Sequence, residues 1–130
     1  MGRGSPITPV EAEKTRDCGT PKVSATDRPK DLAATARADA YMNRIFLDPI
    51  ETGRYPDELA DVFGSAWPAF ASSDMEEILT DTDFYGINYY TRAVCVNDPT
   101  DPPERARRVR QPGHPYTEMG WEVFAPAFRD

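Results

Sequence analysis

The pattern of apolar and polar positions predicts a helix over residues 28–47. A mostly apolar stripe recurs there every three or four positions, at Leu32, Ala36, Ala40, Asn43 and Leu47. Pro29 fits the first helical turn, where a missing backbone N–H costs nothing. We expect the helix to stop at Asp48, because a residue that precedes a proline, here Pro49, avoids the α region.

Two shorter helices are predicted farther along the chain. The first opens at Pro56, covers the apolar positions up to residue 63 and ends at Gly64. Ser73 and Glu76 have the three-residue spacing of a capping box, which predicts a second helix that continues through Leu79.

Residues 84–91 are the best strand candidate, because they are rich in aromatic side chains and follow a polar turn-forming run. Successive side chains of a strand point to opposite faces. One face would carry Phe84, Gly86, Asn88 and Tyr90, and the other would carry Tyr85, Ile87 and Tyr89. We expect residues 93–96 to continue this strand or to pair with it.

The rest of the chain has little periodicity. Residues 1–27 combine prolines, glycines and charges, so we expect an irregular, poorly ordered segment ahead of a folded unit at residues 28–130. Residues 97–116 are predicted to form a proline-rich loop. Helices, one strand and a long loop indicate an α/β protein, but one strand cannot make a parallel sheet by itself.

The charge and hydropathy of the chain argue against two classes of partner. Its formal net charge of −7 would repel a phosphate backbone, so we expect no nucleic-acid partner. The basic run at residues 105–110 is more simply interpreted as a solvated loop. No apolar run approaches the roughly 20 residues that span a bilayer, so we expect no membrane partner. The N-terminus lacks the apolar core of a secretory signal, which predicts a cytoplasmic protein.

Residues that carry metal or nucleophilic chemistry are sparse. Cys18 and Cys95 belong to no CxxC or CxxH pattern, so we expect no metal site. Two reduced thiols are the simpler interpretation, and the sequence leaves a disulfide open. His114 stands alone in a loop, without signs of a Ser-His-Asp triad. No glycine-rich phosphate motif occurs, and we expect no cofactor.

Three residues are candidates for a binding site. Asn88 and Tyr90 share one face of the predicted strand, as polar side chains do at the active-site end of a barrel strand. An aromatic strand with ordinary partners explains them equally well. Trp121 follows a turn-like segment, and its ring could stack on the apolar face of a sugar or close the edge of a core.

Several motifs together resemble family 1 of the glycoside hydrolases, the β-glucosidase family. The resemblance runs from about residue 25 to residue 130. The matching segments are Ala38-Asp39-Ala40-Tyr41-Met42-Asn43-Arg44, Phe46-Leu47-Asp48-Pro49-Ile50, Gly53-Arg54-Tyr55-Pro56, residues 83–92 and Thr117-Glu118-Met119-Gly120-Trp121-Glu122-Val123. Their order and spacing are those of the family. The first two dozen residues, where the family has its fifth strand, do not match.

The resemblance implies a partial (β/α)₈ TIM barrel, from the helix after strand five to the loop before strand seven. The family's acid/base glutamate lies in a T-x-N-E-P motif and its nucleophilic glutamate in a T-E-N-G motif, and this chain contains neither. Glu118 is not the nucleophile, because its segment matches a different family motif, T-x-M-G-W. Retaining glycosidases need both carboxyl groups.

By resemblance, the function is that of a β-glucosidase-type O-glycosyl hydrolase acting on β-glucosides or oligosaccharides. Tyr90 would hydrogen-bond the nucleophile, Asn88 would support it, and Trp121 would lie near the aglycone entrance. We expect this chain to be inactive alone and consider other barrel fragments as partners. The alternative is a non-catalytic protein of the same origin that binds a sugar or a partner chain.

Overall fold

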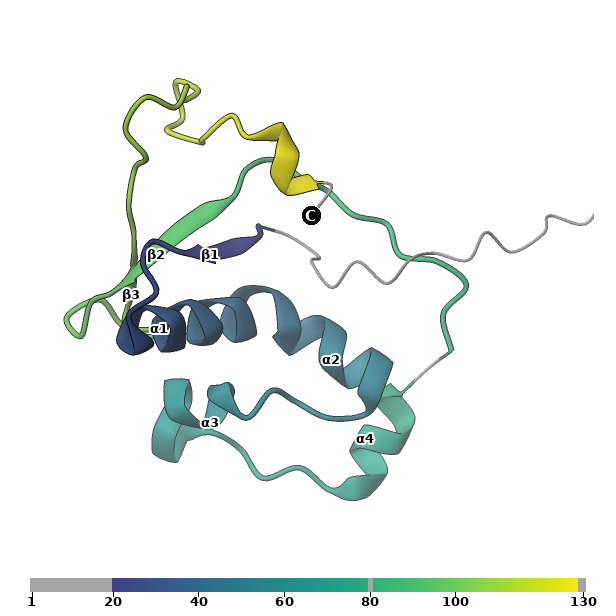
Figure 1. Ribbon diagram of the computed structural model, residues 1–130. Helices are drawn as coiled ribbons and strands as arrows, with labels where there is room; N and C mark the ends of the chain where they lie inside the picture. The colour runs from purple at the N-terminus through teal and green to yellow at the C-terminus, as the bar shows by residue number, and fades with distance from the viewer. Residues whose placement is uncertain (1–19, 80, 129–130) are drawn as a thin grey trace, which may run out of the picture.

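The computed structural model describes residues 20–79 and 81–128. Three strands, four α-helices and three other helical segments follow one another along that part of the chain (Figure 1). In chain order they are β1 (Lys22–Ser24), α1 (Pro29–Asp39), the π-helix η1 (Ala40–Arg44), α2 (Ile45–Thr52), α3 (Glu58–Phe63), the 3₁₀ helix η2 (Gly64–Ala66), α4 (Ser72–Ile78), β2 (Ala93–Asn97), β3 (Ala106–Arg108) and the 3₁₀ helix η3 (Ala125–Phe128).

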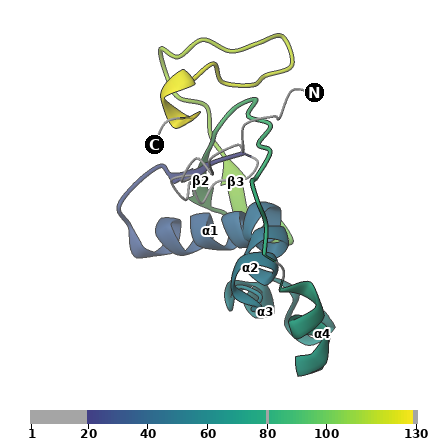
Figure 2. The ribbon, with the colours of Figure 1, turned by 90° about the vertical axis from the view of Figure 1, so that its right-hand side faces the viewer.

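The three strands form one small mixed sheet in the order β1-β2-β3. β1 pairs in parallel with β2, with Lys22 opposite Ala93, and β2 pairs antiparallel with β3, with Cys95 opposite Arg108. Figures 1 and 2 place the helices on one side of this sheet and the chain after β3 on the other. The segment predicted to be irregular therefore supplies a strand, although residues 1–19 lie outside the described part.

The first predicted helix is longer than expected. It passes through a π-helical stretch and continues through Pro49 to Thr52, so the prediction that it stops at Asp48 is wrong. Arg44 donates to Asp48 one turn ahead at 3.1 Å and to Glu58 at 3.1 Å, which stabilises the helical conformation of the residue before the proline. The helix ends at Gly53, whose φ of 67° needs a glycine-like backbone.

The two short helices occur where the sequence predicts them, with different starts. The first is α3, which begins at Glu58 and not at Pro56; its C-cap is Gly64, as expected. The second begins at Ser72, and its N-terminal hydrogen bond runs from the Ala71 N–H to Asp74 at 3.2 Å. The predicted capping box at Ser73 and Glu76 is therefore wrong. The helix begins two residues earlier, with Ala71 as its N-cap, and Asp74 accepts the hydrogen bond from the Ala71 N–H.

The predicted strand at residues 84–91 is also wrong. These residues form no strand, and the chain first enters the sheet at Ala93. A strand exists only through a neighbour's ladder, and residues 84–91 have no neighbouring strand in the described chain. The predicted alternation still holds in their exposure, since Ile87 and Tyr89 are half-buried while Asn88 and Tyr90 are exposed.

A core of small side chains holds α1 against β2. Ala38, Ala93 and Cys95 are buried together, with Ala106 packed at their edge. Small side chains let the helix approach the sheet closely, and polar contacts fix its position. Asp31 is buried in the first turn of α1 and accepts a hydrogen bond of 2.8 Å from the Asn97 N–H at the end of β2. No helix of the described residues is both long and apolar enough to cross a bilayer.

Candidate functional site

Two of the three predicted site residues lie against each other. The ring centroids of Tyr90 and Trp121 are 5.5 Å apart, with an angle of 48° between the planes. Tyr90 is 66% exposed and Trp121 is 36% exposed, so the pair forms an aromatic surface open to solvent. The alternative interpretation, in which Trp121 closes the edge of a core, stays a prediction. Asn88 is exposed and makes no hydrogen bond to any other described residue.

Trp121 is positioned by a tight turn over residues 117–120. Gly120 donates to the Thr117 carbonyl at 2.9 Å, and its φ of 78° is a left-handed conformation that a glycine adopts without strain. The Thr117 N–H then bonds the Trp121 carbonyl at 2.9 Å, and Tyr116 forms an antiparallel bridge with Glu122. The Glu118 side chain of this turn is exposed.

A buried ion pair fixes this turn to the segment that carries Tyr90. Glu122 is 4% exposed and accepts two hydrogen bonds of 2.9 Å from Arg92, one on each carboxylate oxygen. The Thr91 hydroxyl donates to the Glu122 carbonyl at 2.9 Å. Tyr90 directly precedes Thr91 and Arg92, and Trp121 directly precedes Glu122. The contacts between these neighbours therefore keep the two rings next to each other.

Two rings complete the environment of the ion pair. The Arg92 guanidinium lies 3.5 Å from the centroid of the Phe124 ring, and His114 stacks on the same ring from 5.7 Å. His114 also contacts a carboxylate oxygen of Glu122 through Nδ1. The described partners of His114 are the Glu122 carboxylate and the Phe124 ring. That His114 takes no part in a catalytic triad stays a prediction.

The chemistry of Glu122 is that of a fixed anion. The hydrogen bond from Arg92 is the main reason why the pKa of Glu122 lies below its ordinary value, and His114 acts in the same direction against the effect of burial. The same pairing raises the pKa of Arg92. A carboxylate that stays ionised and has both oxygens occupied is unsuited to donate a proton as a general acid.

Acidification is expected to destabilise the fold through this pair. Because the folded pKa of Glu122 is lowered, its contribution is complete above the ordinary value of 4.5 and is lost as the pH falls through the folded value. Urea unfolding at a series of pH values, for the chain and for Glu122→Gln, would measure the effect. Asp31 and Asp98 also have lowered pKa values, so only the difference between the two proteins reports on Glu122. If the free energy of unfolding fell equally with decreasing pH in both proteins, Glu122 would not be a source of the acid sensitivity.

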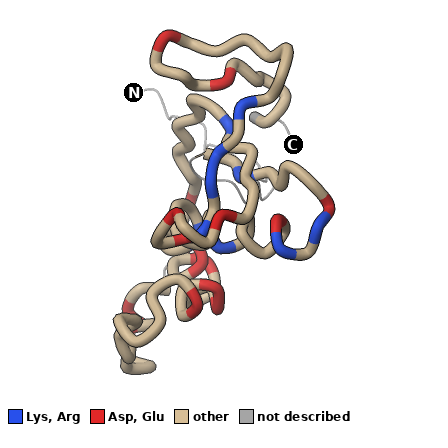
Figure 3. The backbone as a smooth tube through the Cα atoms, turned by 90° about the vertical axis from the view of Figure 1, so that its left-hand side faces the viewer, with Lys and Arg blue, Asp and Glu red and all other residues tan. Residues whose placement is uncertain are grey.

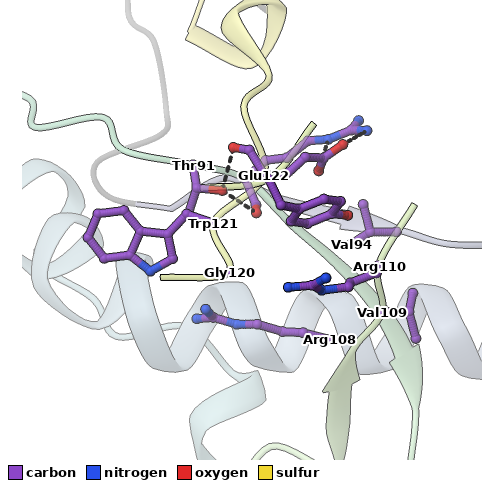
Figure 4. Close-up of a pocket in the computed structure, with 10 residues that line it drawn as sticks. Thr91, Val94, Arg108, Val109, Arg110, Gly120, Trp121 and Glu122 are labelled. Atoms are coloured by element: carbon purple, nitrogen blue, oxygen red, sulfur yellow. Dashed lines mark hydrogen bonds and ion pairs between the residues drawn. The ribbon is translucent and has the colours of Figure 1, made fainter. Parts of the chain in front are cut away.

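A pocket of about 90 Å³ adjoins the aromatic pair (Figure 4). Its lining residues are Thr91, Arg92, Val94, Arg108, Val109, Arg110, Tyr116, Gly120, Trp121 and Glu122. Glu122 is the one acidic residue among them, and Arg92 already neutralises it. The pocket therefore has no pair of carboxyl groups at the spacing of roughly 5–5.5 Å that retaining glycoside hydrolysis requires.

Residues 14–130 match the profile of Glycosyl hydrolase family 1. The chain belongs to this family. It is 35% identical over 107 residues to a beta-glucosidase from an Agrobacterium species, a match that covers 81% of this chain and 23% of the relative. It is 36% identical over 100 residues to the 1,4-beta-D-glucan glucohydrolase of Thermotoga neapolitana, covering 76% of this chain and 23% of the relative.

Solved structures agree with the sequence matches. The crystal structure of a beta-glucosidase from Exiguobacterium marinum superposes with a TM-score of 0.75 at 33% identity, covering 85% of this chain and 25% of that chain. The family 1 β-glucosidase from Thermotoga maritima gives 0.71 at 29% identity, over 82% of this chain and 23% of that chain. This glycosyl hydrolase family 1 chain thus spans about a quarter of its relatives' length and has a partial (β/α)₈ barrel fold, as predicted.

Sequence reasoning found the aromatic residues of the site but missed the groups that position them. The partners Arg92 and Glu122 are 30 positions apart, and no local spacing rule links such residues. Both stand inside motifs that were recognised, directly after Tyr90-Thr91 and directly after Trp121. Adjacency to two candidate site residues was the available signal. Among the described residues, no group of three or more His, Cys, Asp or Glu side chains could hold a metal ion.

Proposed function

We propose that this chain forms one wall of a β-glucoside-hydrolysing site whose two catalytic glutamates come from polypeptide outside these 130 residues. Tyr90 would donate a hydrogen bond to the nucleophilic carboxylate, with Asn88 beside it, and Trp121 would contact the aglycone. The chain alone would not hydrolyse glycosides.

One observation carries the proposal: Tyr90 and Trp121 lie side by side and are both exposed. The ion pair of Arg92 with Glu122 stabilises this placement without involving either ring. The Tyr90 hydroxyl has no hydrogen-bond partner among the described residues. A substrate and a carboxylate supplied by other polypeptide would cover such exposed groups. The similarity to proteins named as beta-glucosidases supports a β-glucoside as the class of ligand.

A chimera tests the proposal. The corresponding quarter of the Exiguobacterium marinum enzyme would be replaced by residues 20–130, and turnover of 4-nitrophenyl β-glucoside would be compared with that of the isolated chain. We expect turnover by the chimera and none by the chain. In the chimera, Tyr90→Phe is expected to lower kcat by about 10- to 100-fold, the effect of losing a hydrogen bond to a charged group.

Tyr85→Phe is the matched control. It also removes a tyrosine hydroxyl from residues 84–91, but at an odd-numbered position, on the face opposite to that of Tyr90. It should leave kcat unchanged. Turnover by the isolated chain, or equal effects of the two tyrosine variants, would contradict the proposal.

The exposed rings also favour a second candidate, a non-catalytic sugar-binding protein. Calorimetric titration of the isolated chain with cellobiose distinguishes the two. Saturable heat that disappears in Trp121→Ala, together with an inactive chimera, would favour binding without catalysis.

A further inference from the structure

The pocket beside Trp121 carries positive charge that no described residue neutralises. Arg108 and Arg110 both line it, and neither forms an ion pair within the described chain. Figure 4 shows their side chains extending on the same side of the strand, toward Gly120 and Trp121. The chain as a whole has a net charge of −7, so this is a local reversal of sign.

The alternation of β3 explains why these two arginines converge. Residues two apart on an extended strand share a face, and the bond from the Val109 N–H to the Val94 carbonyl, 2.8 Å, extends the ladder beyond Arg108. Arg107 points to the other face and is paired with Asp98 at 3.1 Å. Figure 3 shows the basic positions of this part of the chain and the acidic positions of the helices beneath the sheet.

Arg110 is held in place by groups that leave its donors available. Its guanidinium lies 4.6 Å from the centroid of the Tyr116 ring, and its Nη2 lies so close to Gly120 that an added Cβ there would be 3.3 Å away. No described residue accepts a hydrogen bond from Arg110, so its N–H groups are available to an anion.

Lys22 adds to the positive potential near Arg108. Burial lowers the pKa of Lys22 to about 8, and the neighbouring Arg108 is the second cause. Lys22 and Arg108 therefore lie close enough to repel each other, which adds to the positive potential of this region. Two unpaired guanidinium groups beside an aromatic surface are the features of a site for a flat ring that carries a carboxylate.

We propose that this pocket binds the carboxylate end of an aromatic acid, through Arg108 and Arg110, with the ring of the ligand lying against Trp121. A volume of about 90 Å³ is well below the roughly 300–1,000 Å³ of sites that enclose a drug-sized ligand, so the pocket takes only one end of the molecule. This inference rests on the proposed function, in which Trp121 contacts the aglycone, and it specifies an acidic aryl aglycone.

Nuclear magnetic resonance of the full ¹⁵N-labelled chain tests the proposal. The indole N–H signal of Trp121 would be followed during titration with 4-methoxybenzoate and with its neutral analogue 4-methoxybenzamide. Trp67 provides an internal control, because it belongs to a separate aromatic cluster with Tyr55, Phe63 and Phe70. We expect a saturable shift of the Trp121 signal alone, with binding at least about tenfold weaker for the amide.

The arginine variants supply the specificity test. Arg108→Gln and Arg110→Gln are each expected to weaken benzoate binding at least about tenfold. Arg107→Gln removes the same charge from the opposite face of the strand and should bind as the unaltered chain does. Equal binding of acid and amide, or equal weakening by all three variants, would overturn the proposal. These measurements need no turnover, so their failure is separate from failure of the chimera.

Discussion

Glu122→Gln is expected to lower the free energy of unfolding by about 3 kcal/mol, the effect of removing one partner from a buried ion pair. Glu122 is 4% exposed and accepts both Arg92 bonds, so the variant leaves a guanidinium that is only 13% exposed without its anion. The glutamine fills the same volume, which confines the change to charge and hydrogen bonding. Urea unfolding followed by circular dichroism measures the loss.

Glu118→Gln is the matched control for this prediction. It makes the same chemical change four residues earlier in the same turn, at an exposed side chain. We expect a change within about 0.5 kcal/mol, as for most surface substitutions. A destabilisation of similar size in both variants would show that net charge, and not the Arg92 pair, is responsible.

Leu59→Ala is expected to destabilise the chain by about 3 kcal/mol, within the range measured for fully buried leucines. Leu59 is the largest side chain with no exposure in the described residues, and it fixes α3 against α1 and η1. The other buried side chains of the core are mostly alanines, which cannot move far enough to fill the cavity. Thermal unfolding followed by calorimetry would measure the effect.

Val62→Ala provides the comparison on the same helix. Val62 is half-buried, so its truncation removes less contact and is expected to destabilise by about 1 kcal/mol. If Val62→Ala proved as destabilising as Leu59→Ala, α3 would be held by its whole apolar stripe and not by one anchor.

The helical elements could be predicted from the sequence because their signals are local. The spacing of three and four residues together with Pro29 correctly located the first helix. Gly64 correctly located the end of α3. The end of the first helix could not be predicted from Pro49, since a bridge from Arg44 to both Asp48 and Glu58 stabilises the turn that the proline disfavours. That bridge depends on α3 packing nearby, which a local rule does not contain.

The strands were harder to predict because a strand is defined by its partner. Residues 84–91 have the stronger β composition, yet the sheet is formed by Lys22–Ser24, Ala93–Asn97 and Ala106–Arg108. For the site, Tyr90 and Trp121 could be named as candidate residues from motifs, whereas the Arg92–Glu122 pair could not, because its two residues meet only in three dimensions.

The parallel pairing of β1 with β2 has a consequence for how the chain reaches its structure. Every residue of the helical region lies between these two strands, so their ladder has high contact order and closes late. β2 and β3 are joined by only eight residues and can pair first. β1 is therefore synthesised before β2 and β3 but pairs only after them, and its edge is open to other chains throughout that interval.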